Sequence, residues 1–181
     1  MSRIGNKPVP VPKGVQVTVA PGAITVKGPK GSLTQNVHAD MALAVKDGNV
    51  VVSRPSDAKQ HKALHGLTRA LINNMMVGVT AGYQKTLEVM GVGYRAQQQG
   101  KGVLLNVGLT HTVEIAPLQD VEIQVEGQNR IHVRGTDKQR VGETAATIRR
   151  VRPPNAYKEK GIKYADERIK LKPGKAAARK K

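Results

Sequence analysis

The sequence predicts an α+β protein: two tandem copies of a small, mainly antiparallel sheet with one packed helix, followed by a basic C-terminal tail. Three observations predict this fold. Short apolar runs alternate at period two between Gly, Pro and Asn residues, each half contains a segment with helical periodicity, and the halves align after a shift of 80 positions. We expect domains at residues 1–82 and 83–152 and an extension at residues 153–181.

The first half contains several strand-like segments. Residues 15–19, 24–26 and 41–45 alternate, whereas residues 50–52 are continuously apolar, which is typical of a more buried strand. Asp47 and Gly48 tolerate the positive φ that a tight hairpin requires. Residues 28–31 fit the Gly-x-x-Gly loop with which KH domains clamp a nucleic-acid backbone, but they lie between two strand-like runs. We therefore interpret them as a hairpin turn.

A helix is predicted next, with Ser56-Asp57 as its N-cap. His61 and His65 are four residues apart on this helix, a spacing that can hold a metal ion. Because no third ligand is indicated beyond Asp57, we favour histidines that pack or face solvent. Residues at spacings of three and four predict the buried face of the helix: Leu64, Leu67, Leu71, Met75 and Val79.

The second half repeats this order of elements. The shift pairs residues 40–45 with residues 120–125, Asn49 with Asn129, and Val51 with Ile131. The residues at 136–139 predict a cap for a helix that carries Val141, Ala145 and Ile148 on one stripe. Pro153-Pro154 should end it, because proline lacks the backbone donor and its ring clashes with the preceding turn.

One glycine-rich segment of the second half needs a separate interpretation. Residues 91–95 (Gly-Val-Gly-Tyr-Arg) lack the third glycine and the following helix of a dinucleotide-binding loop. A strand that bends, or another backbone that comes close, explains these glycines better.

The composition favours a nucleic-acid partner. The formal net charge is +17, a field that attracts polyanions. No apolar span or basic amphipathic helix indicates a membrane partner, and the N-terminus lacks the apolar stretch of a secretory signal. The absence of cysteine excludes disulfides and cysteine-based metal sites and fits a reducing cytosol. We expect a cytoplasmic protein.

The sequence offers no active site. Only four serines occur, none in a Gly-x-Ser-x-Gly context, and the few carboxylates lie mainly in strands or at caps. We therefore predict a non-enzymatic protein with no cofactor, no metal and no small-molecule substrate.

The C-terminal segment carries the highest charge density. Residues 153–181 hold ten Lys or Arg and three Asp or Glu, and we expect residues 172–181 to be disordered without a partner. From residue 149 onwards, cations alternate with Tyr157, Tyr164 and Gly161. Cations neutralise phosphates, tyrosines stack on bases or ribose, and glycine allows close approach to a phosphate. The candidate RNA-binding residues are Arg149, Arg150, Arg152, Tyr157, Lys158, Lys160, Gly161, Lys163 and Tyr164.

Three segments resemble one known family. Residues 2–8 (Ser-Arg-Ile-Gly-Asn-Lys-Pro), residues 85–96 and, most specifically, residues 152–167 are similar in order and spacing to the bacterial form of large-subunit ribosomal protein number six. The resemblance implies two domains of one fold and binding to large-subunit ribosomal RNA near the sarcin–ricin loop and the stalk base. Neighbouring ribosomal proteins, and translation factors close by, are the other implied partners.

The resemblance also implies that RNA contacts lie largely in the second domain and tail. One position departs from the family pattern, since Glu159 stands where similar proteins usually carry a small residue between two lysines. Two other classes of protein are alternatives to this hypothesis. A DNA-compacting or general nucleic-acid chaperone needs only the charge, and an RNA-modifying or metal-dependent enzyme needs a bound cofactor or metal.

Overall fold

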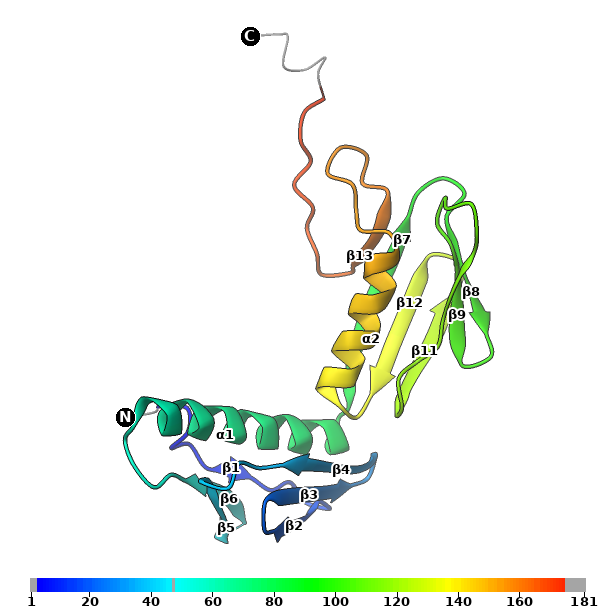
Figure 1. Cartoon of the computed structure of the whole chain (residues 1–181). Coiled ribbons are helices and arrows are strands. Elements are labelled where there is room, and N and C mark those ends of the chain that lie inside the picture. The colour runs from blue at the N-terminus through cyan, green and yellow to red at the C-terminus, as the bar shows by residue number, and fades with distance from the viewer. Residues whose placement is uncertain (1–2, 47, 175–181) are drawn as a thin grey trace. The chain divides into compact units, whose positions relative to one another are not determined.

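The computed structural model describes residues 3–46 and 48–174 (Figure 1). The expected disorder of residues 172–181 falls mostly on residues 175–181, which lie outside the described residues. The chain divides into two compact units: Met1–Tyr83 with residues 136–138, and Gln84–Gly135 with Gln139–Lys181. No helix within the described ranges is long and apolar enough to span a bilayer.

The first unit consists of two three-stranded antiparallel sheets and one helix. One sheet has the order β1-β6-β5 and the other β2-β3-β4, and helix α1 (Lys59–Thr80) packs across strands of both (Figure 1). The strands are β1 (Val9–Pro10), β2 (Gln16–Ala20), β3 (Ala23–Gly28), β4 (Gly31–Asn36), β5 (Ala42–Lys46) and β6 (Asn49–Ser53).

Both expected turns of the first unit join paired strands. Gly28 pairs with Gly31 across the β3–β4 turn, which confirms the hairpin interpretation of that segment. Lys46 pairs with Asn49 across the β5–β6 turn, where Gly48 has a φ of +72°. The apolar side chains of these sheets and of α1 form one buried core: Val9, Ile24, Val26, Met41, Val50, Val52, Ile72, Met75, Met76 and Val79.

The buried face of α1 differs from the predicted one. Met75 and Val79 are buried as expected, but Leu67 is 55% exposed, and His65 and Thr68 are buried in its place. His65 can be buried because its Nε2 lies 2.9 Å from the carbonyl oxygen of Val52, which satisfies the ring. The spacing of apolar residues alone gives the wrong buried face for α1, because that face also contains polar side chains.

The predicted N-cap was also wrong. Helix α1 begins at Lys59 after Ala58, without a side-chain cap. The hydroxyl of Ser56 instead accepts a hydrogen bond from the amide of Ala58 and pairs with Nδ1 of His61 at 2.7 Å.

The second unit repeats the architecture of the first. Its three-stranded sheet has the order β10-β9-β8, and its larger sheet has the order β11-β12-β7-β13. In Figure 1, α2 (Lys138–Val151) lies along this larger sheet, and its buried side chains include Val141, Ala145 and Ile148, as predicted. The strands are β7 (Tyr83–Met90), β8 (Arg95–Gln99), β9 (Gly102–Asn106), β10 (Val113–Ile115), β11 (Val121–Glu126), β12 (Arg130–Gly135) and β13 (Gly161–Tyr164).

The order of the sheets confirms the duplication. Strands β5-β6-β1 correspond to β11-β12-β7, strands β2-β3-β4 correspond to β8-β9-β10, and one helix follows the β5–β6 or β11–β12 hairpin in each unit. The predicted α+β fold class is therefore confirmed.

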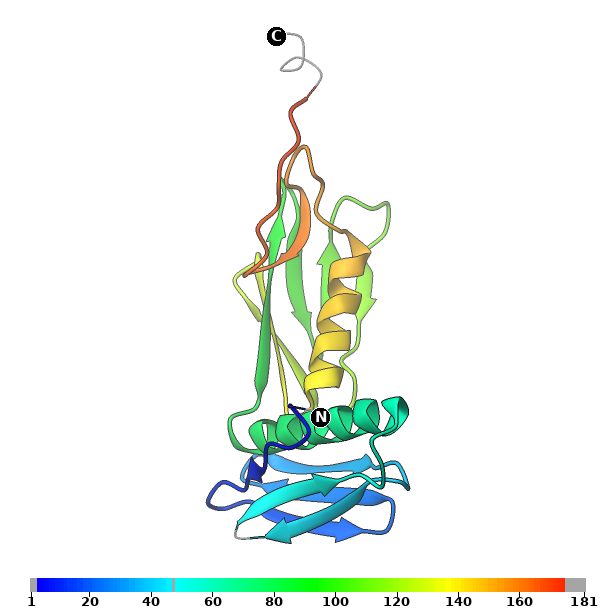
Figure 2. The ribbon, with the colours of Figure 1, turned by 90° about the vertical axis from the view of Figure 1, so that its left-hand side faces the viewer.

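Strand β13 has no counterpart in the first unit and corrects the expectation of a separate tail. Residues 161–164 pair antiparallel with β7, from Gly161 opposite Met90 to Tyr164 opposite Leu87. Figure 2 shows the chain turning back after α2 to run beside β7. Ile162 is fully buried, so the beginning of the basic extension belongs to the core of the second unit.

Candidate nucleic-acid interface

The candidate site lies in the loop that joins α2 to β13. The amide of Ile162 donates to the carbonyl of Arg152 at 2.7 Å, which closes the base of the loop. Inside it, the amide of Asn155 donates to the carbonyl of Lys160 at 2.9 Å, and the side-chain oxygen of Asn155 accepts from the amide of Tyr157 at 2.7 Å. These bonds give the loop, residues 152–160, a defined conformation.

Five of the predicted RNA-binding residues are exposed on or beside this loop. Tyr157 is 61% exposed, a large value for an aromatic side chain. The four exposed cations form no ion pair within residues 3–46 and 48–174, so their charge is available to an external anion. We call these residues the basic end: Arg150, Arg152, Tyr157, Lys158 and Lys160.

Two other predicted residues support the loop from within. The guanidinium of Arg149 pairs with the carboxylate of Glu167 and lies 5.7 Å from the ring centre of Tyr164. The ammonium of Lys85 lies 5.5 Å from the same ring centre. Both cation–π contacts occupy Tyr164, which is only partly exposed.

The ion pair between Arg149 and Glu167 shifts the pKa of each group in the direction that favours its charged form. The hydrogen bond from Arg149 lowers the pKa of Glu167, and burial opposes this effect. The same hydrogen bond raises the pKa of Arg149. This pair fixes the segment after β13 on α2.

Lys163 and Gly161 also have internal roles. Nζ of Lys163 lies 3.6 Å from a carboxylate oxygen of Glu88 on the neighbouring strand. Gly161 is buried with a φ of +141°, and a Cβ there would lie 2.6 Å from the carbonyl oxygen of Pro153. We predicted this glycine as a point of close approach for a phosphate, but the backbone it approaches is that of Pro153-Pro154.

Glu159 occupies a backbone conformation that favours glycine. Its φ is +55°, one of two positive values at non-glycine residues in the described part of the chain. Its amide donates to the carbonyl of Asn155 at 3.0 Å, which holds the turn in place. Glu159 therefore has a conformational cost at this position as well as an effect on charge.

Two exposed residues at the same end were missing from the prediction. Because Gly161 pairs with Met90, the loop after β7 and the loop before β13 emerge at one end of the sheet. The β7–β8 loop carries Val92, which is 91% exposed, and leads into exposed Arg95. In the sequence, Gly91 and Gly93 beside Val92 indicate a bend in the chain, but they do not indicate in which direction the loop points.

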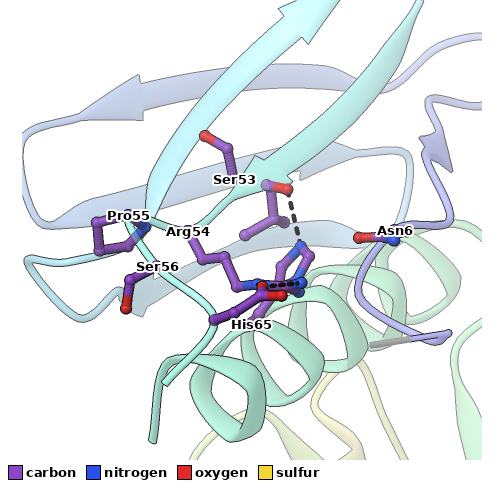
Figure 3. A pocket seen from close by; sticks show the side chains of 8 residues that line it. Asn6, Ser53, Arg54, Pro55, Ser56 and His65 are labelled. Atoms are coloured by element: carbon purple, nitrogen blue, oxygen red, sulfur yellow. Dashed lines mark hydrogen bonds and ion pairs between the residues drawn. The ribbon is translucent and has the colours of Figure 1, made fainter. Parts of the chain in front are cut away.

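The first unit contains a pocket lined by His65 of α1 (Figure 3). Arg54 lies 2.7 Å from Nδ1 of His65, and its other donors reach the carboxylate of Asp57. The hydrogen bond from Arg54 lowers the pKa of Asp57. His65 thus has a partner at each ring nitrogen, and Gly5 packs directly on the ring. The charged and ring groups of Arg54, Asp57 and His65 therefore have their partners within the protein.

His61 and His65 face different partners. Nε2 of His61 lies 3.3 Å from the carboxylate of Asp40, and the two histidines share no ligand. In the described ranges, no three His, Asp or Glu side chains gather in a way that suits a metal ion.

Comparison with known proteins decides the family. The model of the family described as Ribosomal protein L6 matches residues 11–82 and 90–165, which cover most of both units. The chain belongs to the ribosomal protein L6 family. This confirms the resemblance seen in the sequence, and it confirms the prediction of a structural protein without enzymatic activity.

Curated members of the family match over nearly the whole chain. The large ribosomal subunit protein uL6 of Carboxydothermus hydrogenoformans is 59% identical over 99% of this chain and 98% of its own length. The proteins of the same name from Caldicellulosiruptor saccharolyticus and Clostridium novyi are 57% and 58% identical, each over 97% of this chain. The family match thus covers both copies of the duplicated unit.

Proposed function

We propose that the chain is a structural constituent of the large ribosomal subunit and binds 23S-type ribosomal RNA with the basic end of its second unit. The observation that carries this proposal is the exposure of four unpaired cations around one exposed tyrosine on a loop of defined conformation. Cations that need not leave internal partners can neutralise phosphates without losing a folded-state contact. The names of the relatives support a place in the large subunit.

The proposed binding site is the RNA near the sarcin–ricin loop and the stalk base, as the family resemblance implies. Neighbouring ribosomal proteins are the other direct partners, and translation factors act close by. The chain then works in the cytoplasm as part of the ribosome. In this proposal the sheets and helices support the binding residues, and the basic segment from residue 149 onwards supplies most of the electrostatic contact.

Truncation after residue 152 is a poor test, because it would remove β13 from the sheet. Substitution of exposed side chains tests the proposal more sharply. We expect Arg152→Gln, Lys158→Gln and Lys160→Gln, combined in one variant, to weaken binding to a 23S fragment that contains the sarcin–ricin loop. Each lost phosphate contact should reduce the slope of log affinity against log salt by about 0.7–0.9.

The matched control replaces three exposed lysines of the first unit with Gln: Lys13, Lys27 and Lys46. It removes the same net charge, so an equal loss of affinity in both variants would mean that the basic end is not the site. Tyr157→Ala against Tyr157→Phe separates ring stacking from the hydroxyl. Loss of about 1–3 kcal/mol of binding free energy only in the alanine variant is expected.

The same measurement separates the proposal from a general nucleic-acid chaperone. A chaperone that needs only charge binds duplex DNA and the ribosomal RNA fragment equally at matched salt. We expect a clear preference for the RNA fragment, and equal affinities for duplex DNA and the RNA fragment would contradict binding at one specific ribosomal site.

A further inference from the structure

The two copies of the duplicated fold differ at one sheet edge. Strand β11 of the second unit and β5 of the first occupy equivalent places, since each pairs with only one neighbour, β12 or β6. The shift of 80 positions brings Ile123 onto Leu43 and Val125 onto Val45. The backbone groups of these residues can therefore be compared pair by pair.

In the second unit the edge of β11 is closed by a side chain. The carboxamide nitrogen of Gln98 on β8 donates to the carbonyl of Ile123 at 3.0 Å. Its oxygen accepts from the amide of Val125 at 3.0 Å. One glutamine thus takes the place of a neighbouring strand for both backbone groups.

The first unit lacks this closure. Strand β2 corresponds to β8 with a shift of 79, which places Val19 at the position of Gln98. A valine side chain has no hydrogen-bonding group, and Val19 is 39% exposed. The glutamine that closes the edge of the second unit has no equivalent on β2.

The unused backbone groups of β5 can be assigned from the hairpin. Lys46 and Asn49 flank a two-residue turn, so Lys46 and Ala44 exchange hydrogen bonds with β6. The amide and carbonyl groups of Leu43 and Val45 then point away from β6. Within residues 3–46 and 48–174, neither residue makes a backbone hydrogen bond besides those of the pairing with β6.

Most of this edge also lacks the features that usually protect an edge strand, since the only charged residue of β5 is Lys46 at its end. The four residues from Ala42 to Val45 include no charge, proline or bulge, and Val45 is 50% exposed. On the outer face of the same hairpin, Ala44 and its partner Val51 are exposed as well. An extended segment that pairs with β5 would satisfy the two residues' backbone groups and cover Val45.

We propose that β5 binds an extended strand from a neighbouring protein of the ribosomal particle, with a carboxylate of that strand beside Lys46. The inference rests on the proposed function for the presence of such a neighbour. Charge selects the partner, since residues 1–82 carry a net charge of +7 and would repel a second copy of themselves. Main-chain hydrogen bonds provide the affinity, as in other cases of strand addition.

Hydrogen exchange tests the pairing directly. The amide of Val45 should exchange without protection in the free chain and be slowed at least tenfold in purified large subunits. The amide of Ala44 bonds to β6 and should be protected in both states, which makes it the internal control. An unprotected Val45 amide in a subunit that contains the chain would overturn the inference while leaving the proposed function intact.

Proline variants separate the edge from the fold. Val45→Pro removes only the outward amide, so the free chain should fold and bind the 23S fragment as before, while its occupancy in large subunits falls several-fold. Ala44→Pro removes a bond to β6 and should destabilise the free chain. If the unmodified chain did not bind the 23S fragment, the proposed function would be contradicted. If Val45→Pro were present in large subunits at the same level as the unmodified chain, only the strand pairing would be contradicted.

A photo-crosslinking residue in place of Val45 identifies what covers the edge. Crosslinking to another protein of the subunit is the expected result. Crosslinking to RNA, crosslinking to a second copy of the chain, or no crosslink in assembled subunits would each overturn the inference.

Discussion

The side chains of Arg149 and Glu167 form a two-point ion pair, with Nε of the guanidinium 2.9 Å from Oε2 of the carboxylate. The same Oε2 lies 3.2 Å from the amide nitrogen of Tyr164, which donates to it. One carboxylate thus joins the last turns of α2 to the end of β13. The loop of the basic end lies between these two elements, so its position depends on this contact.

Removal of the Glu167 charge should loosen this contact. We expect Glu167→Gln to lower the free energy of unfolding at pH 7 by about 2 kcal/mol, because a hydrogen bond to a charged group is lost in a partly buried site. Urea unfolding measures the change. Asp166→Asn is the control, since Asp166 is exposed and its lysine partner lies 3.5 Å away, and it should change little.

The same pair predicts a pH dependence with a defined sign. Arg149 lowers the pKa of Glu167 in the folded state, so the ion pair makes its full contribution to stability above the ordinary carboxyl pKa of 4.5. It should disappear as the pH falls through the lowered value. The difference in unfolding free energy between the unmodified chain and Glu167→Gln should therefore shrink as the pH falls below 4.5. A difference that stays constant would contradict this assignment.

Glu159 carries both a charge and a strained backbone. We expect Glu159→Gly to stabilise the protein by about 1 kcal/mol, because glycine adopts positive φ without a Cβ clash. Glu159→Gln removes the charge but keeps the strain, so its unfolding free energy should be close to that of the unmodified chain. If Glu159 lies near RNA, both variants should bind the 23S fragment more tightly. Tighter binding by the glycine variant alone would indicate a conformational effect.

Gly161 should not tolerate a side chain. A Cβ would lie 2.6 Å from backbone atoms of Pro153 and Pro154, and the φ of +141° disfavours other residues. We expect Gly161→Ala to cost about 3 kcal/mol or more in unfolding free energy. Gly142→Ala in α2 is the control, because open space surrounds that position. Its helix should gain about 0.5–1 kcal/mol, and thermal unfolding of both variants measures the contrast.

Gln98 joins the two sheets of the second unit. Its carboxamide nitrogen also contacts the carbonyls of Gly100 and Gly102, at 3.0 and 3.1 Å. We expect Gln98→Ala to reduce the unfolding free energy by about 0.5–1.5 kcal/mol, because the hydrogen bonds of the carboxamide to Ile123 and Val125 are lost. Gln99→Ala changes an exposed side chain and should have an effect below about 0.5 kcal/mol. Equal effects would show that the bridge is not needed.

The strands and their order were largely predictable from local pattern. Alternation at residues 15–19 and 41–45 and the glycine-containing turns locate β2, β5 and their hairpins, because a strand with one buried face must alternate. The shift that aligns Asp40 with Asp120 predicts the duplication from sequence alone. The basic end was predictable as a composition, since charge density is a property of the sequence.

The roles of individual cations were less predictable. Arg149 and Arg150 are adjacent in a basic run, but their side chains leave the helix in different directions, so Arg149 reaches Glu167 and Arg150 stays exposed. His65 is polar yet buried, because a backbone carbonyl and an arginine lie within reach in the folded state. Partners that are distant in sequence leave no periodic signal.

Residue pattern and composition were enough to predict the duplicated α+β fold, the excess of positive charge and the family, because each of these depends on local sequence. The tertiary structure alone decided that residues 161–164 complete a sheet, that Gly161 faces prolines, and that one sheet edge is closed while its counterpart is open. The physical reason is that a strand's neighbours and a side chain's hydrogen-bond partners are set by which segments meet in space.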